Sequence, residues 1–258
     1  MRTRMRVGSR AILNAAVSIL VMAGCVKAAA NAVHKALPDG TIRTLVLHKL
    51  DHKKMLHDNN IQVVVEDGSV TLTGSVPSLG EEKQAEKLAL SVEDVTRVIN
   101  RLTIEPARSD QQMADDFAKD VRSFVFYDIF DWITGDVDHG VLSLQGYVRE
   151  PWRKADYQRL AEDVAGVREV HNEIQVLPLS SYDDQLRIAT ARLIYTDPLF
   201  VRYAHRALPP IHIIVENGRI LLKGAVANRL ERQEIESIVR SGVVAFDVVD
   251  DLKVDNET

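Results

Sequence analysis

Hydrophobic and polar positions follow one pattern that occurs three times along the chain. Two alternating runs flank a glycine turn in the segments IQVVVEDGSVTLTGSV, ITGDVDHGVLSLQGYV and IHIIVENGRILLKGAV. Alternation with a period of two is typical of a strand with one buried face. The second glycines of the copies, Gly74, Gly146 and Gly224, stand 72 and 78 residues apart. We therefore expect three copies of one unit, each able to fold on its own.

A helical pattern follows each strand pair, and a further alternating run follows the helix. The apolar positions have the spacing i, i+3, i+4, i+7, which marks one buried helix face. These positions are Ala85, Leu88, Ala89 and Val92, then Tyr157, Leu160, Ala161 and Val164, then Ile235, Ile238, Val239 and Gly242. The last runs cover residues 98–104, 170–176 and 248–254. Each unit is thus predicted to hold two strands, a helix and a last strand.

Turn and cap residues support these elements. Asp67-Gly68, His139-Gly140 and Asn217-Gly218 predict tight hairpins, because glycine accepts a positive φ. Ser78 with Glu81 predicts a capping box, Asn228 with Glu231 repeats it, and Pro151 suits the first turn of the middle helix.

A further helix is expected at the start of each unit. In the first unit it covers Thr41 to about Leu56, where apolar residues recur among charged ones. In the third unit, Asp197 and Pro198 predict that this helix is broken in two. The expected fold class is α+β, with three tandem αββαβ two-layer sandwiches, each a three-stranded mixed sheet packed by two helices. We place the units at residues 39–105, 110–178 and 182–255, with short linkers between them.

The first residues predict export. Four arginines, an apolar stretch from Ala11 to Gly24 and no acid before Asp39 are typical of a secretory signal peptide, here residues 1–24, followed by a tether at 25–38. Cys25 follows Met22-Ala23-Gly24, which resembles the lipoprotein box in which the cysteine is lipidated. The alternative is an ordinary cleavage site at Ala28–Ala30 and a start near Asn31. Because Cys25 is the only cysteine, no internal disulfide is possible.

Charge and composition narrow the class of protein. Removing residues 1–24 changes the formal net charge from −5 to −9, which disfavours nucleic acid as a partner. A hydrophobic content of 46% supports ordered cores.

The repeated unit resembles a known family. The strand-turn-strand pattern, the capped helix with alanines and the run around Gly166, Val170 and Asn172 are similar to the BON domain. The first copy has Asp94 at the glycine place, and the third has Val244 there and Asp250 for the asparagine. The resemblance spans about Asp39 to Asp255. It implies αββαβ units in a bacterial periplasmic protein that binds phospholipid or membrane surface and supports envelope integrity under stress. It brings no catalytic motif.

Metal and catalytic sites are not expected. His48 and His52 lie four residues apart with His57 nearby, a spacing that zinc sites use. The segment is rich in charge and no motif places a third ligand, so a solvated helix face is the favoured interpretation. No carboxylate pair has a spacing that fixes an acid and a base. We predict neither a metal, nor a cofactor, nor enzyme activity.

Two surfaces are candidates for binding. One combines basic and apolar residues of the broken helix, which suits an anionic membrane surface or a partner protein, with ordinary packing as the alternative: Arg192, Leu199, Phe200, Arg202, Tyr203 and Arg206. The other holds aromatics expected on a core face of the middle unit's first helix: Phe124, Phe126, Tyr127, Phe130 and Trp132.

The leading hypothesis is a lipid-anchored, non-enzymatic periplasmic protein that binds membrane phospholipid or envelope proteins. The alternative is a periplasmic docking or chaperone module, in which strand edges or the aromatic helix take up client proteins. A module that senses small ligands or ions is a third possibility. The pattern does not fix an oligomeric state.

Overall fold

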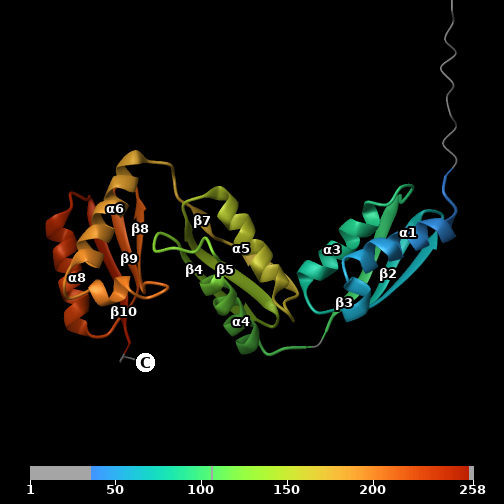
Figure 1. Cartoon of the computed structure of the whole chain (residues 1–258), viewed down its shortest axis with the longest axis horizontal. Helices are drawn as coiled ribbons and strands as arrows, with labels where there is room; N and C mark the ends of the chain where they lie inside the picture. The colour runs from blue at the N-terminus through green and yellow to red at the C-terminus, as the bar shows by residue number, and fades with distance from the viewer. Residues whose placement is uncertain (1–35, 106, 256–258) are drawn as a thin grey trace, which may run out of the picture. The chain divides into compact units, whose positions relative to one another are not determined.

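Three αββαβ units follow one another along the chain (Figure 1). The computed structural model describes residues 36–105 and 107–255, and residues from Leu37 onward form a single compact body. The predicted signal peptide, most of the tether and Cys25 lie outside the described residues.

The elements of the units correspond one to one, apart from short extra helices and one divided strand. The first unit consists of α1 Asp39–His52, α2 Met55–Asp58, β1 Asn60–Glu66, β2 Ser69–Val76, α3 Leu79–Leu90 and β3 Arg97–Ile104. The middle unit consists of α4 Asp110–Ser123, β4 Trp132–Asp138, β5 Val141–Val148, α5 Pro151–Asp163, β6 Glu169–Asn172 and β7 Gln175–Val176. The third consists of α6 Ser181–Thr196, α7 Val201–Ala204, β8 Ile211–Glu216, β9 Arg219–Val226, α8 Arg229–Gly242 and β10 Asp247–Val254.

Each sheet is mixed, as the sequence predicts. The first two strands of a unit pair antiparallel, and the last strand pairs parallel with the second, which therefore lies in the middle of the sheet. The parallel register is the same in all three units, with Val70 opposite Val98, Leu142 opposite Val170 and Ile220 opposite Val248. In the middle unit the last strand is divided into β6 and β7, which both pair with β5.

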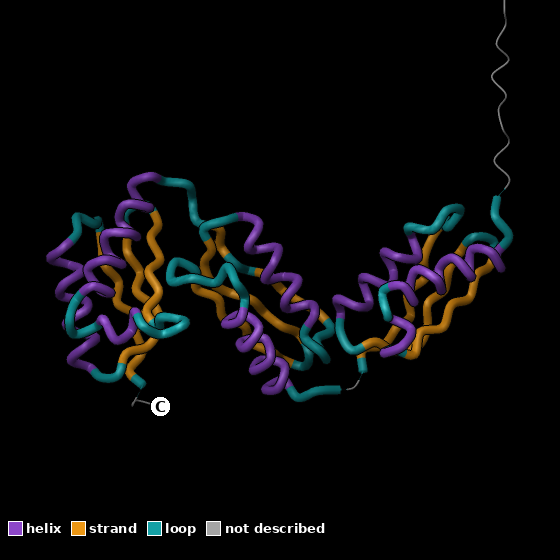
Figure 2. Tube along the Cα trace, in the orientation of Figure 1, coloured by secondary structure: helices purple, strands orange, loops and turns teal. Residues whose placement is uncertain are grey.

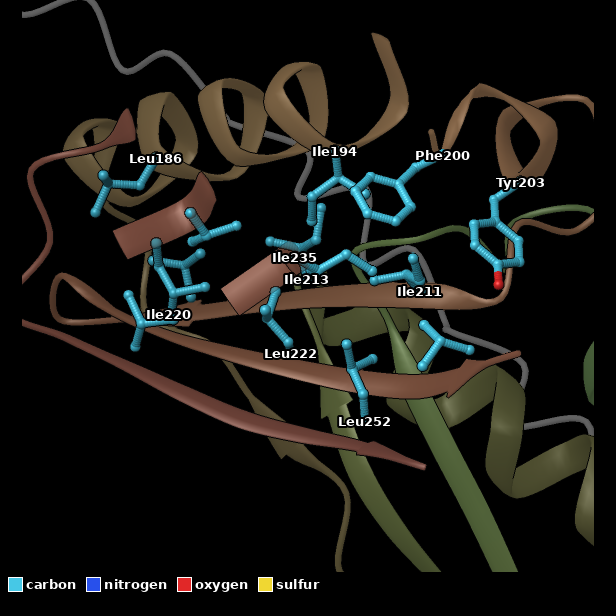
Figure 3. Packing of buried hydrophobic residues seen from close by; sticks show 14 of the residues in the cluster. Leu186, Ile194, Phe200, Tyr203, Ile211, Ile213, Ile220, Leu222, Ile235 and Leu252 are labelled. Atoms are coloured by element: carbon cyan, nitrogen blue, oxygen red, sulfur yellow. The ribbon is translucent and has the colours of Figure 1, made fainter. Parts of the chain in front are cut away.

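Each unit has a hydrophobic core between its helices and one face of its sheet. The predicted helix faces are buried at Ala85 and Ala89 in α3 and at Tyr157 and Ala161 in α5. Figure 3 shows the third core, where side chains of α6 and α8 point toward β8 and β9. Burial of apolar area contributes about 25 cal/mol per Å², so these faces hold the layers together.

The two glycines of each copy have different roles. Both turn residues have positive φ, for example Asn217 at 51° and Gly218 at 75°, which gives the backbone twist that tight hairpins need. Gly224 has a φ of 113°, and a Cβ there would collide with the carbonyl oxygen of Pro210 where β8 begins. A side chain at this second place would separate the two strands.

An aspartate at the start of each unit's first helix clamps the hairpin, a feature the sequence analysis missed. The carboxylate of Asp183 accepts the amide N–H groups of Asn217 and Gly218 at 3.0 and 2.8 Å. Asp39 and Asp110 bind the turn amides of their own units in the same way. The hydrogen bonds between the two strands leave both turn amides without an acceptor, and the aspartate carboxylate supplies one.

Helix starts agree with the sequence in part. The Ser78 hydroxyl accepts the Glu81 N–H at 3.3 Å, but the Glu81 carboxylate accepts from Asn59 instead of closing the predicted box. A complete capping box occurs at Ser109 and Gln112, where none was predicted. Asn228 caps α8, and Pro151 opens α5 as predicted.

The prediction that the middle aromatics lie on a helix is wrong. Helix α4 ends at Ser123, and a loop runs from there to the start of β4 at Trp132 (Figure 2). The Asp128 carboxylate accepts the Phe130 N–H at 2.8 Å, a local bond that competes with continuation of a helix. Phe124, Tyr127 and Phe130 pack against hydrophobic cores from this loop.

The broken helix of the third unit is confirmed. Helix α6 ends at Thr196, and α7 begins at Val201. Between them the Asp197 carboxylate accepts the Leu199 N–H at 2.8 Å, a local bond of the same kind as that between Asp128 and Phe130.

Candidate functional site

At one end of the third unit, side-chain contacts form a junction between α7 and α8. The Tyr203 hydroxyl donates to a Glu231 carboxylate oxygen at 2.5 Å and accepts the Ala227 N–H at 3.0 Å. The Arg202 guanidinium forms an ion pair with the same carboxylate. Helix α7 is therefore held against the first turn of α8.

The structure separates the six residues that the sequence grouped as a contact site. Phe200 and Tyr203 are buried in the core, so their side chains do not form a surface. Leu199, Arg202 and Arg206 are exposed on or beside α7. Arg192 is exposed on α6, and no contact described in residues 107–255 joins its side chain to α7.

Arg202 and Arg206 are positioned by one aromatic ring. Their guanidinium carbons lie 4.8 and 5.1 Å from the centroid of the Tyr203 ring, within the range of cation–π attraction. Tyr203 itself is fixed by Glu231. Both guanidinium groups are thereby held at the edge of the core, and Glu231 compensates the charge of Arg202.

Two exposed apolar residues that the sequence analysis did not select stand in the same region. Val201 begins α7, and Leu230 lies in the first turn of α8 with 73% of its area exposed. Leu199 is 59% exposed. We call the exposed residues of this junction the α7 surface: Leu199, Val201, Arg202, Arg206 and Leu230. No signal in the sequence points to Leu230, because single exposed leucines are common on protein surfaces and only the structure places this one beside α7.

The middle unit has an exposed aromatic pair at the corresponding end. The Phe126 and Trp152 rings meet edge to face, with centroids 5.0 Å apart, and both are partly exposed. Val125 beside them is also exposed. Trp152 occupies the same place in α5 as Leu230 in α8, two residues after the end of the preceding loop.

A buried ion pair supports the loop that carries Phe126. Asp131 has no exposed area and pairs with the Arg153 guanidinium, while the Tyr157 hydroxyl lies 3.5 Å from the same carboxylate oxygen. Burial raises the pKa of Asp131 to about 6, because the loss of hydration outweighs the attraction of Arg153. Asp131 has these internal partners, so we interpret it as a positioning group for the loop.

The described ranges contain no group of three or more His, Cys, Asp or Glu side chains that could hold a metal ion. His48 and His52 are both exposed on α1. In the same ranges no helix has the length and apolar character needed to cross a membrane.

Comparison with known proteins identifies the repeated unit. The BON domain profile matches residues 38–106, 129–178 and 202–256, which together make up more than half of the chain. The chain belongs to the BON domain family. The three matched segments confirm three tandem BON repeats, and the family is generally non-catalytic. No curated protein sequence matches the chain.

Two of the solved structures that match the chain are distant from it in sequence. CdsD, a structural protein of the type III secretion system of Chlamydia trachomatis, is 15% identical, with 83% of this chain and 92% of that chain covered and a TM-score of 0.23. The PrgH periplasmic domain is 12% identical, with 78% and 98% covered and a TM-score of 0.21. The family match, and not these structures, carries the assignment of the BON fold.

Proposed function

We propose that this BON protein is a non-enzymatic component of the bacterial envelope, located in the periplasm, that binds anionic phospholipid surfaces through the α7 surface. Its role would be to support envelope integrity under stress, as in other BON proteins. Family membership supports the envelope setting. The α7 surface supports the binding step.

The observation that carries the proposal is that exposed apolar and basic side chains stand together where contacts of Glu231 hold α7 against α8. Leu199, Val201 and Leu230 offer apolar area that can enter the region between headgroups and acyl chains. Arg206 stands beside them, and a basic residue near an anionic surface contributes about 1 kcal/mol, whereas the charge of Arg202 is compensated by Glu231. Because Tyr203 already orders both arginines, binding costs little side-chain entropy.

Lipidation of Cys25 would supply a second membrane signal. A single acyl chain holds a protein weakly, but full lipoprotein modification carries more than one chain and would hold the protein at a membrane by itself. We propose that the anchor keeps the protein at a membrane and that the α7 surface decides how the third unit approaches it. Mass spectrometry of the mature amino terminus tests the lipid anchor. An unmodified amino terminus near Asn31 would show that Cys25 is not lipidated and would rule out the anchor.

A flotation assay tests the α7 surface. Residues 31–258 are mixed with vesicles of phosphatidylethanolamine and phosphatidylglycerol, and with vesicles of phosphatidylcholine alone. We expect binding to the anionic vesicles that falls with added salt, because exposed charges are screened. The variant Leu199→Asp, Arg206→Glu, Leu230→Asp should bind at least tenfold more weakly.

The matched control makes the same kinds of change in the first unit. Val64, Leu90 and Arg101 are exposed there, so the control variant is Val64→Asp, Leu90→Asp, Arg101→Glu. It should float like the unchanged protein. Equal binding by both variants would show that the α7 surface is not the contact. A separate variant, Arg192→Glu, shows whether the predicted arginine on α6 takes part.

The exposed aromatic pair favours a second function, the docking of envelope proteins. Phe126 and Trp152 are large side chains of the type that dominates protein interfaces, and both are partly exposed. A photo-reactive amino acid at Phe126 should crosslink to a defined envelope protein in cells, and Trp152→Ser should reduce that crosslink. Crosslinks to lipid alone would favour the membrane function.

A further inference from the structure

A cleft in the compact body is lined by residues of the middle and third units. Its volume is about 690 Å³, within the range of small-molecule sites. Helix α4 and strand β4 supply one wall, and strands β9 and β10 supply another. The cleft uses none of the residues of the α7 surface.

The apolar part of the cleft is an ordered aromatic cluster around His212. The His212 Nδ1–H donates to the Asp131 carbonyl oxygen at 2.6 Å. The Tyr127 ring stacks on the imidazole and the Trp132 ring meets it edge to face, each with centroids 5.2 Å apart. Burial lowers the pKa of His212, so this floor is uncharged at neutral pH. Tyr127 and Trp132 thus present fixed aromatic surface.

The charged part of the cleft is basic. Arg122, Lys223 and Lys253 line it, and Asp251 is the one acidic side chain among its lining residues in the part of the chain described here. Lys223 forms an ion pair with Asp251. Arg122 and Lys253 have no ion pair within residues 107–255. An excess of positive charge in a protein of net charge −5 favours a negatively charged occupant.

We propose that this cleft binds a small organic anion with an aromatic or acyl body. Its carboxylate, phosphate or sulfonate group would pair with Arg122 and Lys253, and its apolar body would lie against Trp132 and Tyr127. Such an anion can be a free amphiphile or part of a membrane lipid, which share this chemistry. The site adds ligand binding to the membrane role and does not depend on it.

Trp132 provides a direct readout of the cleft. The chain has two tryptophans, so Trp152→Phe leaves Trp132 as the single tryptophan and keeps an aromatic ring beside Phe126. The probes are decanoate below its micelle concentration and 1-anilinonaphthalene-8-sulfonate. We expect a saturable change in Trp132 fluorescence with both. Decanol has the same apolar body without the charge, and it should bind at least tenfold more weakly than decanoate.

Variants of the basic residues decide the result. Arg122→Glu with Lys253→Glu should weaken decanoate binding at least tenfold, whereas Lys119→Glu, exposed on the same helix and outside the cleft, should not. Vesicles in place of free decanoate show whether a membrane lipid can supply the anion. The proposal is overturned if decanoate produces no saturable change, if decanol binds equally well, or if the double variant binds like Lys119→Glu.

Discussion

At the residue scale, one position of the last strand shows how the repeats keep their geometry while their sequences change. Asn100, Asn172 and Asp250 each accept the N–H of the residue two places on, at 3.1, 3.1 and 3.0 Å. The helix residue facing this position is Glu82 in the first unit and Arg232 in the third, at the same place in the repeat. The Asn100 amide donates to Glu82, whereas Asp250 accepts from Arg232 at 2.6 Å.

Reversing the charge of Arg232 should therefore destabilise the third unit. Arg232→Glu would place two carboxylates together, and we expect the free energy of unfolding to fall by about 2 kcal/mol. Adding Asp250→Asn recreates the pair of the first unit and should recover most of the loss. Hydrogen exchange of the β10 amides measures both variants. Equal exchange in the single and double variants would contradict the coupling.

The sequence shows Asp250 as a departure from the family pattern, but it does not show that Arg232 pairs with this carboxylate. Arg232 lies 18 residues away on a different element, and only the packing of α8 on β10 makes the two residues neighbours. Buried apolar positions such as Ala161 follow from periodicity, because one repeating property defines them. A polar pair depends on two particular side chains meeting, which a single sequence does not specify.

His212 predicts a pH dependence of stability. The imidazole is neutral in the fold, since its pKa is lowered below the ordinary value of 6.5. Unfolded chains therefore bind the proton more readily, so this stabilisation is present above pH 6.5 and is lost as the pH falls through the lowered pKa. We expect the melting temperature of the protein to fall from pH 7.5 to pH 5 relative to that of His212→Asn, which can still donate to the Asp131 carbonyl.

Comparison of the unchanged protein with the His212→Asn variant isolates the contribution of His212 to the pH dependence of stability. Asp131 acts in the opposite direction, because a pKa of about 6 favours the fold as the pH falls below 6, but it is present in both proteins. His52→Asn, on the exposed side of α1, is the control and should follow the unchanged chain. Parallel melting curves for all three proteins across this pH range would rule out the role of His212.

At the scale of elements, the second glycine of each copy decides whether the hairpin and the preceding loop can meet. Gly224→Ala adds a methyl group against the Pro210 carbonyl at a φ that alanine rarely adopts. We expect a loss of about 3 kcal/mol in the stability of the third unit, measured by hydrogen exchange of β8 and β9. Gly40→Ala, with open space around it in α1, should be neutral or slightly stabilising. Similar effects of the two changes would exclude the collision.

The aspartate clamp gives a second prediction for elements. Asp183→Ala would leave the buried Gly218 amide and the part-buried Asn217 amide without their acceptor, and an unsatisfied buried group costs about 1–3 kcal/mol. Limited proteolysis at the β8–β9 turn should become faster. Asp115→Ala, exposed on α4, is the control. Unchanged cleavage would show that the clamp is dispensable.

Element types were predictable and one connection was not. Strands, hairpins and second helices follow from periods of two and 3.6 and from glycine positions, which are local properties of the chain. The loop from Phe124 to Asp131 has the apolar content of a helix. Its course is set by the Asp128 turn and by the buried pair of Asp131 with Arg153. Phe200 and Tyr203 could not be distinguished from surface residues either, because their burial depends on tertiary contacts and not on local composition.

At the scale of the whole molecule, the middle and third units share a hydrogen-bonded contact. The Ile213 N–H donates to the Ile129 carbonyl oxygen at 2.7 Å, and Ile129 and Phe130 pack against the third core. The first unit contacts the middle one through the Gly166 N–H and the Pro77 carbonyl, at 2.8 Å, and through an ion pair of Lys83 with Glu162.

Loss of the third core should therefore spread to the middle loop. In Gly224→Ala we expect faster hydrogen exchange not only in β8 but also in residues 124–132, because their packing partner is weakened. Strands β1 to β3 should exchange as before. An unaffected middle loop would indicate that the two units unfold independently.

The contact at Ile213 has a consequence for how the chain is made. Strand β8 is an edge strand in which Ile211 to Val215 are all buried, and uncovered strands of this composition attract one another. The middle unit precedes β8 in the chain, so during vectorial synthesis or export the backbone that contacts this edge emerges before the strand does. A fragment that begins after the middle unit would lack this cover, and we expect it to aggregate.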